Sequence, residues 1–281
     1  MLAAVRDFFR GRGFLEVETS VRIPVPALEL HIDAESSGDG YLRTSPEFRL
    51  KRLLCAGLER IYEMGPCFRK GERGRLHNPE YTMLEWYRNG ADYRGVLDDT
   101  RDLVRHVCRV VRGRTVLAYR GAEIDLGEDW ELVTVSSAFI RHAGWDPVAE
   151  YDGDRFDLDL VNTVEPGLPV DRPVVLMDYP LGAAALARAR EGVAERWELY
   201  IGGMEIANAY SELTDPDEQL RRFRECGEAR KALGKEVYPV DEEFMAALRR
   251  GLPECAGVAL GIDRLVMLFA GAERIEEVRA S

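Results

Sequence analysis

The sequence predicts an α+β fold built on a mainly antiparallel sheet of six to seven strands, flanked by helices. Two pairs of neighbouring strand-like segments have the pattern of hairpins, one over residues 60–88 and one over residues 197–213. Strands and helices do not alternate as regular βαβ units, and no glycine-rich dinucleotide-binding or P-loop motif occurs. These observations favour an antiparallel core over a doubly wound parallel sheet.

The first part of the chain contains two expected helices separated by extended segments. Apolar residues recur at helical spacing over residues 3–12 until Gly13 ends the pattern, and the sequence FLEVET then alternates as a strand does. The other elements expected here are a proline-containing extended connection at 23–30, a short strand at 41–44, and a helix at 46–57 that begins with Ser45 as its cap and Pro46 in its first turn.

The elements after residue 60 are predicted from the same kinds of pattern. The strands of the first hairpin, 60–68 and 81–88, enclose a polar, glycine-containing loop, and an apolar stripe predicts a helix over 92–112. The remaining elements expected are strands within 118–126 and at 132–135 and 174–180, helices at 136–143, 215–235 and 241–250, strands on both sides of Gly202–Gly203, and a last small-residue strand that runs into a helix near Ile262.

Composition narrows the class of protein. No stretch approaches the roughly 20 apolar residues that a membrane-spanning helix needs, so no membrane association is expected. The five cysteines are scattered without a C-x-x-C pair, which indicates reduced thiols in a cytoplasmic protein. A protein that binds duplex nucleic acid usually has a basic face, and the net charge of −12 does not indicate one.

The loop of the first hairpin is the strongest candidate for a polyanion site. Four cationic side chains lie within seven residues, at Arg69, Lys70, Arg73 and Arg75. Arginine suits a polyphosphate because its planar fork contacts two phosphate oxygens at once. The alternative is an exposed hairpin tip whose charges only favour solubility.

Two glutamates in GMEIANAYSEL are candidate Mg²⁺ ligands. Glu205 and Glu212 flank Asn208, and Mg²⁺ prefers oxygen ligands and bridges phosphates. Their odd separation turns them to opposite faces of a regular strand, so they reach one site only if the strand bulges or ends between them. The alternative is two unrelated surface glutamates.

Two further groups of residues suggest ligand contacts. Arg264 follows Gly261 in the first turn of the last helix, where free N–H groups attract anions, although it could instead pair with a neighbouring carboxylate. Elsewhere, carboxylates and a phenol on otherwise apolar elements suit an ammonium-bearing substrate, or are separate caps and surface groups. These residues are Ser45, Glu47, Glu85 and Tyr87.

Three segments resemble, in the correct order, the motifs of class II aminoacyl-tRNA synthetases. They are VRDFFRGRGFLEVET, FRKGERGRLHNPEYTMLEWY and GVALGIDRLVMLFAG. HNPEYTMLEWY together with GMEIANAYSELTD is similar to the lysyl branch. The resemblance implies a class II catalytic core over residues 1–281, with a small insertion at about 140–195, and a homodimer formed through the first motif.

The same resemblance assigns an ATP site. It implies that Arg69 binds the α-phosphate, Arg264 the γ-phosphate, and Glu205 and Glu212 the Mg²⁺ and substrate. It also implies nucleotide contacts from residues around the hairpin loop and the two later motifs. These are Lys70, Gly71, Glu72, His77, Asn78, Ile206 and Gly261. Catalysis would be assigned to Arg69, Glu205, Glu212 and Arg264.

The first motif begins at the first residues, which leaves no room for the anticodon-binding domain of lysyl-tRNA synthetases. The chain is therefore similar to the elongation factor P–(R)-β-lysine ligases, and tRNA is not the expected acceptor. That resemblance implies ATP-dependent activation of (R)-β-lysine, or lysine, and its transfer to a lysine of elongation factor P. The substrate would be bound by Ser45, Pro46, Glu47, Glu85, Tyr87, Glu212 and Ala259, the last where lysyl enzymes usually have glycine.

Three departures from the family pattern leave alternatives open. Ser20 replaces the proline usual after EVET, and both termini are short. Gly71 stands where the family has an adenine-recognising glutamate, so either Glu72 substitutes or the backbone alone recognises adenine. The alternatives to the ligase are a lysyl-adenylate-forming paralogue with a tRNA or small-molecule acceptor, and a catalytically silent subunit that binds amino acids and regulates a partner.

Overall fold

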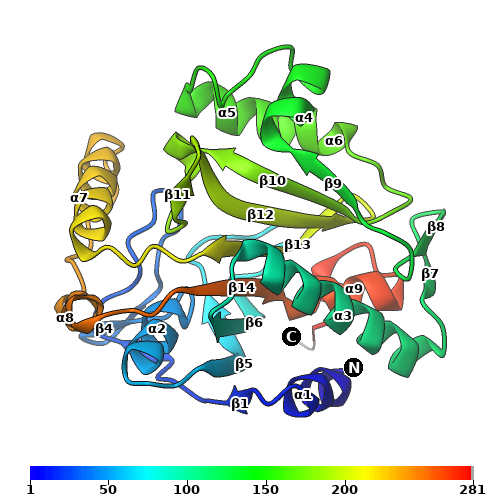
Figure 1. Ribbon diagram of the computed structural model, residues 1–281, viewed down its shortest axis with the longest axis horizontal. Helices are drawn as coiled ribbons and strands as arrows, with labels where there is room; N and C mark the ends of the chain where they lie inside the picture. Colours follow the sequence, from blue (N-terminus) through cyan, green and yellow to red (C-terminus); the bar gives the residue numbers. More distant parts are fainter. Residues whose placement is uncertain (280–281) are drawn as a thin grey trace.

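Six long antiparallel strands form the centre of the structure, a computed structural model that describes residues 1–279. The sheet contains nine strands, in the order β1-β5-β6-β14-β13-β12-β10-β9 with β11 paired to β12 (Figure 1). The central six are β5 (Arg60–Phe68), β6 (Glu80–Asn89), β14 (Cys255–Gly261), β13 (Met204–Ser211), β12 (Val193–Ile201) and β10 (Val174–Pro180).

The α+β class and the antiparallel centre are confirmed, and the strand number is larger than expected. Three short strands extend the sheet: β1 (Leu15–Glu16), β9 (Glu131–Thr134) and β11 (Ala189–Arg190). β1 and β9 pair in parallel with their neighbours. FLEVET forms only two strand residues because the Thr19 backbone N–H and hydroxyl both bond to the Glu63 carboxylate.

Helices on one face of the sheet enclose the largest hydrophobic core. These are α1 (Leu2–Gly11), α3 (Tyr93–Arg112) and α9 (Ile262–Ala270). Phe9 stacks on Tyr62 with ring centroids 4.4 Å apart and meets Trp86 edge-on. α3 begins at the Asp92 side chain, which caps the N–H groups of Arg94 and Gly95. This core holds the strands that carry the open face opposite.

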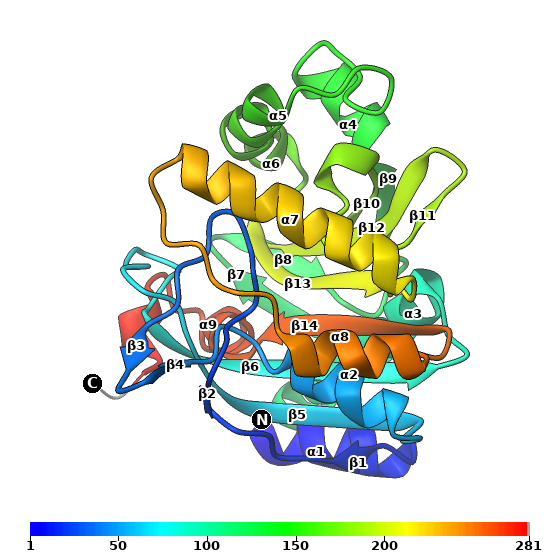
Figure 2. The ribbon, with the colours of Figure 1, turned by 90° about the vertical axis from the view of Figure 1, so that its left-hand side faces the viewer.

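A second set of helices covers one end of the sheet. α2 (Glu47–Cys55), α7 (Pro216–Ala232) and α8 (Glu242–Arg250) pack together in Figure 2 and share a second core. A small sheet of β2 (Arg22–Ile23), β4 (Gly40–Leu42) and β3 (Ser36–Ser37) lies beside them. The connection between β2 and β3 runs along α7, where the Arg230 Nη1 donates to the Glu29 carbonyl at 2.6 Å.

Residues 135–167 form helices around β10. α4 (Val135–His142), α5 (Gly153–Asp159), a π-helical turn at Leu160–Val164 and α6 (Glu165–Gly167) pack on the edge of the sheet. The strands expected within 118–126 form a hairpin, β7 (Val116–Tyr119) and β8 (Ala122–Asp125), beside the C-terminal end of α3.

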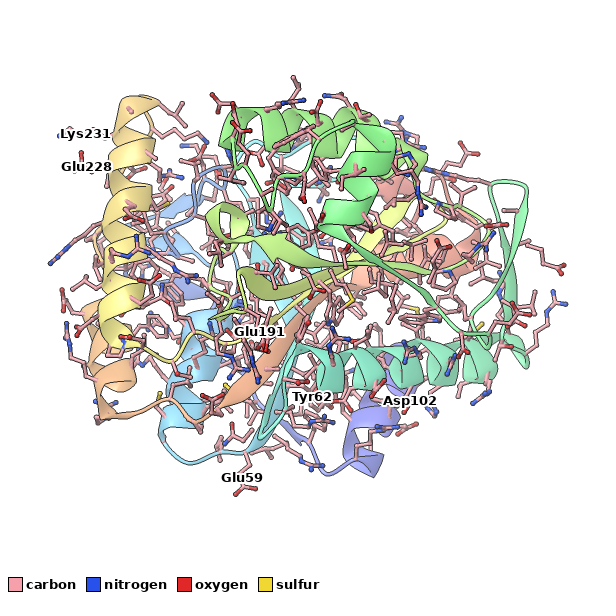
Figure 3. All side chains as sticks on the ribbon, turned by 45° about the horizontal axis from the view of Figure 1, so that its top comes forward. Glu59, Tyr62, Asp102, Glu191, Glu228 and Lys231 are labelled. Carbon is pink, nitrogen blue, oxygen red and sulfur yellow. The ribbon has the colours of Figure 1, made fainter. Side chains whose placement is uncertain are left out.

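Charged side chains surround this framework. Glu59, Glu228 and Lys231 project outward at the edges of the molecule in Figure 3. None of the helices within residues 1–279 combines the length and the apolar character needed to cross a bilayer.

Candidate active site

Strand β14 forms the floor of the candidate site because its alternate residues are very small. Ala256, Val258 and Leu260 point into the core, so Gly257, Ala259 and Gly261 lie on the open face. Their partners on β6 are Tyr87, Glu85 and Met83, in the same order. Small residues on β14 beside larger side chains on β6 leave a trough along β14.

Gly257 lies at the most crowded point of this floor. A methyl group built at this position would come within 2.3 Å of a Tyr87 ring carbon and 2.7 Å of Glu212 Oε1. Both side chains therefore close directly over the glycine. The absence of a side chain at residue 257 leaves the space that Tyr87 and Glu212 occupy.

The first pocket in this trough has about 700 Å³ of empty volume, within the size range of small-molecule sites. It lies between the β5–β6 loop, β13, β14 and the start of α9. Its lining includes nine residues expected from the sequence: Arg69, Glu72, His77, Asn78, Glu205, Ile206, Ala259, Gly261 and Arg264. Lys70 and Gly71 are exposed and lie outside the lining of this pocket and the next, as far as residues 1–279 are described.

Arg264 joins three parts of the first pocket. Its Nη1 donates to the Glu205 carboxylate at 3.0 Å and to the Glu205 carbonyl at 2.9 Å. Its Nη2 lies 2.8 Å from His77 Nε2. Burial and the neighbouring Arg264 guanidinium lower the pKa of His77, so the neutral ring accepts this contact. Asp263 instead accepts from the Thr82 N–H and from Arg279.

Arg69 is held at the inner wall of the pocket. Its guanidinium lies 5.2 Å from the centre of the Tyr81 ring and 3.5 Å from Glu72 Oε2. Burial acts to lower the pKa of Arg69, but Tyr81 and the carboxylates of Glu72, Glu29 and Glu205 outweigh it and raise the value. A permanently charged guanidinium therefore faces the space in which a phosphate would lie.

A bulge in β13 resolves the odd spacing of the two glutamates. The register against β12 shifts because Ile206 is an extra residue between Glu205, opposite Tyr200, and Ala207, opposite Leu199. Glu205, Asn208 and Glu212 thus all reach the open face. They do not share one pocket, since Glu205 lines the first and Glu212 the second, with Asn208 in both.

The second pocket continues the trough and is rich in carboxylates. Its empty volume is about 490 Å³, and it shares Arg69, Met83, Asn208 and Ala259 with the first pocket. Its lining also contains the expected Ser45, Glu47, Glu85, Tyr87 and Glu212. Pro46 precedes α2 and positions Glu47, whose N–H is capped by the Ser45 hydroxyl at 2.9 Å.

Each expected carboxylate in this pocket has a partner. Glu85 accepts from Ser45 Oγ at 2.8 Å and from Tyr87 Oη at 3.0 Å. Burial, and then the charge of Glu47, raise the pKa of Glu85 to about 8. Burial opposes ionisation of Tyr87 as well and raises the pKa of its phenol well above the ordinary value. Tyr87 is therefore a hydrogen-bond donor to Glu85.

Sequence reasoning missed Lys51, a buried cation at the end of the second pocket. Its Nζ lies 2.5 Å from Glu47 Oε1 and 2.6 Å from Glu212 Oε2. Burial acts to lower the pKa of Lys51, but the two carboxylates outweigh it and raise the value. Burial raises the pKa of Glu212, a shift that Lys51 opposes and Glu47 reinforces. One ammonium thus serves two carboxylates.

Sequence reasoning also missed Glu29 and Glu198. Glu29 comes from the proline-containing connection, which has no periodic pattern, and it lines the second pocket. Glu198 on β12 lies opposite Asn208 and accepts from Arg196 at 2.5 Å and from Tyr200 at 2.7 Å. Polar residues alternate with apolar ones along RWELYI, on the side that faces Asn208, and this alternation was the only available signal for Glu198.

Comparison with known proteins places the chain in a family. The model of class II tRNA synthetases (D, K and N) matches residues 1–280. The chain belongs to this family. It is 40% identical to the elongation factor P–(R)-β-lysine ligases of Proteus mirabilis and Vibrio cholerae, and 38% identical to that of Photorhabdus laumondii. Each alignment covers 100% of the chain and 92% of the relative. The resemblance drawn from the three motifs is confirmed.

Proposed function

We propose that the protein is an ATP-dependent ligase that activates (R)-β-lysine, or lysine, as an adenylate and transfers it to a lysine side chain of elongation factor P. One observation carries this proposal: a pocket lined by arginines opens into a pocket lined by carboxylates, with Arg69 in both linings. The relatives named for this reaction share the whole length of the chain, which supports the choice of acceptor.

The first pocket suits the nucleotide. Arg69 would contact the α-phosphate and Arg264 the γ-phosphate, at the start of α9 where free N–H groups add positive potential. His77 and Asn78 belong to the loop that borders the phosphates, and Ile206 and Gly261 line the pocket beside the base or ribose. Glu72 is the candidate for adenine recognition in place of Gly71.

The residues present fit a Mg²⁺ ion on the polyphosphate. Glu205 offers a partly exposed carboxylate in the first pocket, and Mg²⁺ commonly takes one or two protein carboxylates together with phosphate oxygens. Glu212, the second carboxylate expected from the sequence, lines the adjoining pocket and contacts Lys51. When bound, the ion would neutralise charge on the phosphates.

The second pocket suits a diamino acid. Ammonium groups would contact Glu47, Glu85, Tyr87 and Glu212, while the substrate carboxylate would lie near Arg69 at the junction of the pockets. A carboxylate oxygen attacks the α-phosphorus in line, the bond to the leaving pyrophosphate breaks, and an acyl adenylate forms. Arg69 and Arg264 act by holding the reactants and offsetting negative charge, since no covalent nucleophile is needed.

Transfer completes the reaction. The neutral amine of a lysine on elongation factor P attacks the acyl carbon, AMP leaves, and the proton lost from the amine passes to solvent or to the departing phosphate. We place this reaction in the cytoplasm, on a homodimer formed through the first motif, with a protein rather than a tRNA as the acceptor. The free state of all five cysteines is consistent with a reducing compartment.

The proposal is tested by ATP–pyrophosphate exchange with α-lysine and with (R)-β-lysine, followed by mass analysis of purified elongation factor P. The expected result is exchange with at least one of them and a mass gain of one acyl residue on the factor. Exchange without that gain would assign a tRNA or small-molecule acceptor instead. A chain that supports no exchange with either amino acid is a regulatory subunit and not a ligase.

A further inference from the structure

Glu29 differs from the other carboxylates of the second pocket because it has no partner. Glu47 and Glu212 contact Lys51, and Glu85 accepts from Ser45 and Tyr87. Within residues 1–279, no side chain makes a hydrogen bond or an ion pair to the Glu29 carboxylate. Burial raises the pKa of Glu29 to about 7, and Arg69 opposes the shift. The Glu29 carboxylate is thus poorly solvated, and no hydrogen bond or ion pair within the described residues stabilises its charged form.

Glu29 lines the second pocket together with Arg69. Arg69 is the charged residue that acts on Glu29 most strongly, and Arg69 lines both pockets. Tyr87 and Glu212 close over Gly257 in the same pocket. A substrate whose carboxylate lies beside Arg69 therefore presents its proximal amino group to Glu29 and its distal ammonium to Glu85 and Glu212.

The backbone around Glu29 is firmly held. Arg230 is fully buried, and its Nη1 donates to the carbonyls of Glu29 at 2.6 Å and Ile32 at 3.0 Å. Its Nη2 donates to Asp33 at 2.6 Å. Although the segment lacks regular secondary structure, α7 fixes its path, so the carboxylate is positioned before any ligand arrives.

We propose that Glu29 is a specificity-determining residue, which recognises the amino group nearest the substrate carboxylate and so distinguishes a diamino acid from a monoamino acid of the same length. The inference rests on the proposed function, because it assumes a diamino acid as substrate. The geometry that carries it is an unpartnered carboxylate in the second pocket, whose lining also includes Arg69, a residue that lines the nucleotide pocket as well.

Binding of two matched ligands tests the role of Glu29. 3,6-Diaminohexanoate and 6-aminohexanoate differ only in the proximal amine, and calorimetry measures the Kd of each for the full chain. In Glu29→Gln, the Kd of the diamino acid should rise by about tenfold, while that of the monoamino acid changes by less than about twofold. Glu35→Gln removes an exposed carboxylate six residues further along the chain and should change neither Kd.

Three outcomes would overturn the inference: equal losses for both ligands in Glu29→Gln, no loss for either, or a wild-type chain that binds the two equally. Glu29→Asp keeps the charge on a shorter side chain and should retain most of the discrimination, which separates loss of charge from loss of folding. Pyrophosphate exchange is measured in parallel. A wild-type chain that discriminates in binding but supports no exchange refutes the ligase and leaves the role of Glu29 standing.

Discussion

The Nζ of Lys51 lies 2.6 Å from Oε2 of Glu212, and both side chains are almost completely buried. A second carboxylate, Glu47, contacts the same ammonium. Because one cation faces two anions, this end of the site has a deficit of positive charge. An ammonium-bearing ligand supplies it, while Lys51 limits the repulsion between the carboxylates when the ligand is absent.

Replacing Lys51 should destabilise the protein strongly. Lys51→Met leaves two buried carboxylates without a cation, which typically costs about 3–5 kcal/mol of the free energy of unfolding. Urea unfolding monitored by circular dichroism measures the loss. Glu212→Gln is the matched comparison, since Lys51 then keeps Glu47, and it should cost clearly less. Equal losses in the two variants would show that the ammonium does not bridge the carboxylates.

The affinity for a diamino acid should increase with pH. The raised pKa values of Glu29, about 7, and Glu85, about 8, mean that these carboxylates lose their protons between about pH 6 and pH 9, and an ammonium binds best when they are ionised. Calorimetry across this range should show a falling Kd and proton release on binding. A Kd that is independent of pH would contradict the assignment.

The same groups should make the unliganded protein less stable as the pH rises. Their pKa values are raised in the folded state, so the folded chain holds protons that the unfolded chain releases, and the stability this provides is lost as the pH rises through the folded values. The melting temperature of the free protein should therefore fall from about pH 6 to pH 9 by less in Glu85→Gln than in the wild type. A diamino acid should raise the melting temperature more at the higher pH.

Gly257→Ala should impair amino-acid binding selectively. The added methyl group would lie 2.3 Å from the Tyr87 ring and 2.7 Å from Glu212, so these side chains must move. We expect the KM for the amino acid to rise by at least about tenfold, with the KM for ATP within about twofold. Gly153→Ala, whose methyl group has ordinary contacts of 3.6 Å with Tyr151, is the control. An unchanged amino-acid KM would contradict the described floor.

Arg264→Ala should reduce pyrophosphate exchange by about 100-fold or more, because it removes a guanidinium from the proposed γ-phosphate position. It also releases Glu205 and His77, its two side-chain partners. The Kd for ATP should rise while that for the amino acid is preserved. Arg274→Ala removes an exposed arginine paired with Glu276 and should have no effect. Loss of amino-acid affinity in Arg264→Ala would place Arg264 at the other pocket.

Ala259→Gly tests the methyl group at the junction of the pockets. Ala259 is paired with Glu85 on one side and Asn208 on the other, and it lines both pockets. Removing the methyl group should change the ratio of kcat/KM for α-lysine and (R)-β-lysine. A ratio that stays the same would show that this position does not select between them.

The features predictable from the sequence were those with a local signal. Hydrophobic alternation and turns at Gly202–Gly203 located β12 and β13, and the helical stripe located α3 almost to the residue. The two-residue strand β11 had no periodicity to detect, whereas FLEVET alternates as a strand does and forms only the two residues of β1. The family motifs named Arg69, Glu205 and Arg264, and the structure gathers all three around one pocket.

The features missed by the sequence depend on contacts between distant segments. Lys51 follows Glu47 by four residues on a helix, the spacing of an ordinary surface ion pair, and only its contact with Glu212 buries it. Glu29 comes from an irregular connection, and Arg230, about 200 residues further along the chain, gives the connection its path. Neither tertiary contact can be predicted from the spacing of nearby residues.

The extra residue in β13 shifts the alternation of side chains between the two faces of the sheet. On the Glu212 side of Ile206, even-numbered residues face the substrates, and on the Glu205 side odd-numbered residues do. The site residues of β13 are thus odd-numbered before Ile206 and even-numbered after it. Deleting Ile206 would remove the bulge and leave Glu205 two places before Asn208, so a regular strand would present both side chains to the open face. The bulge therefore lets one continuous strand accommodate Ile206 while Glu205, Asn208 and Glu212 keep a common face over two adjoining pockets.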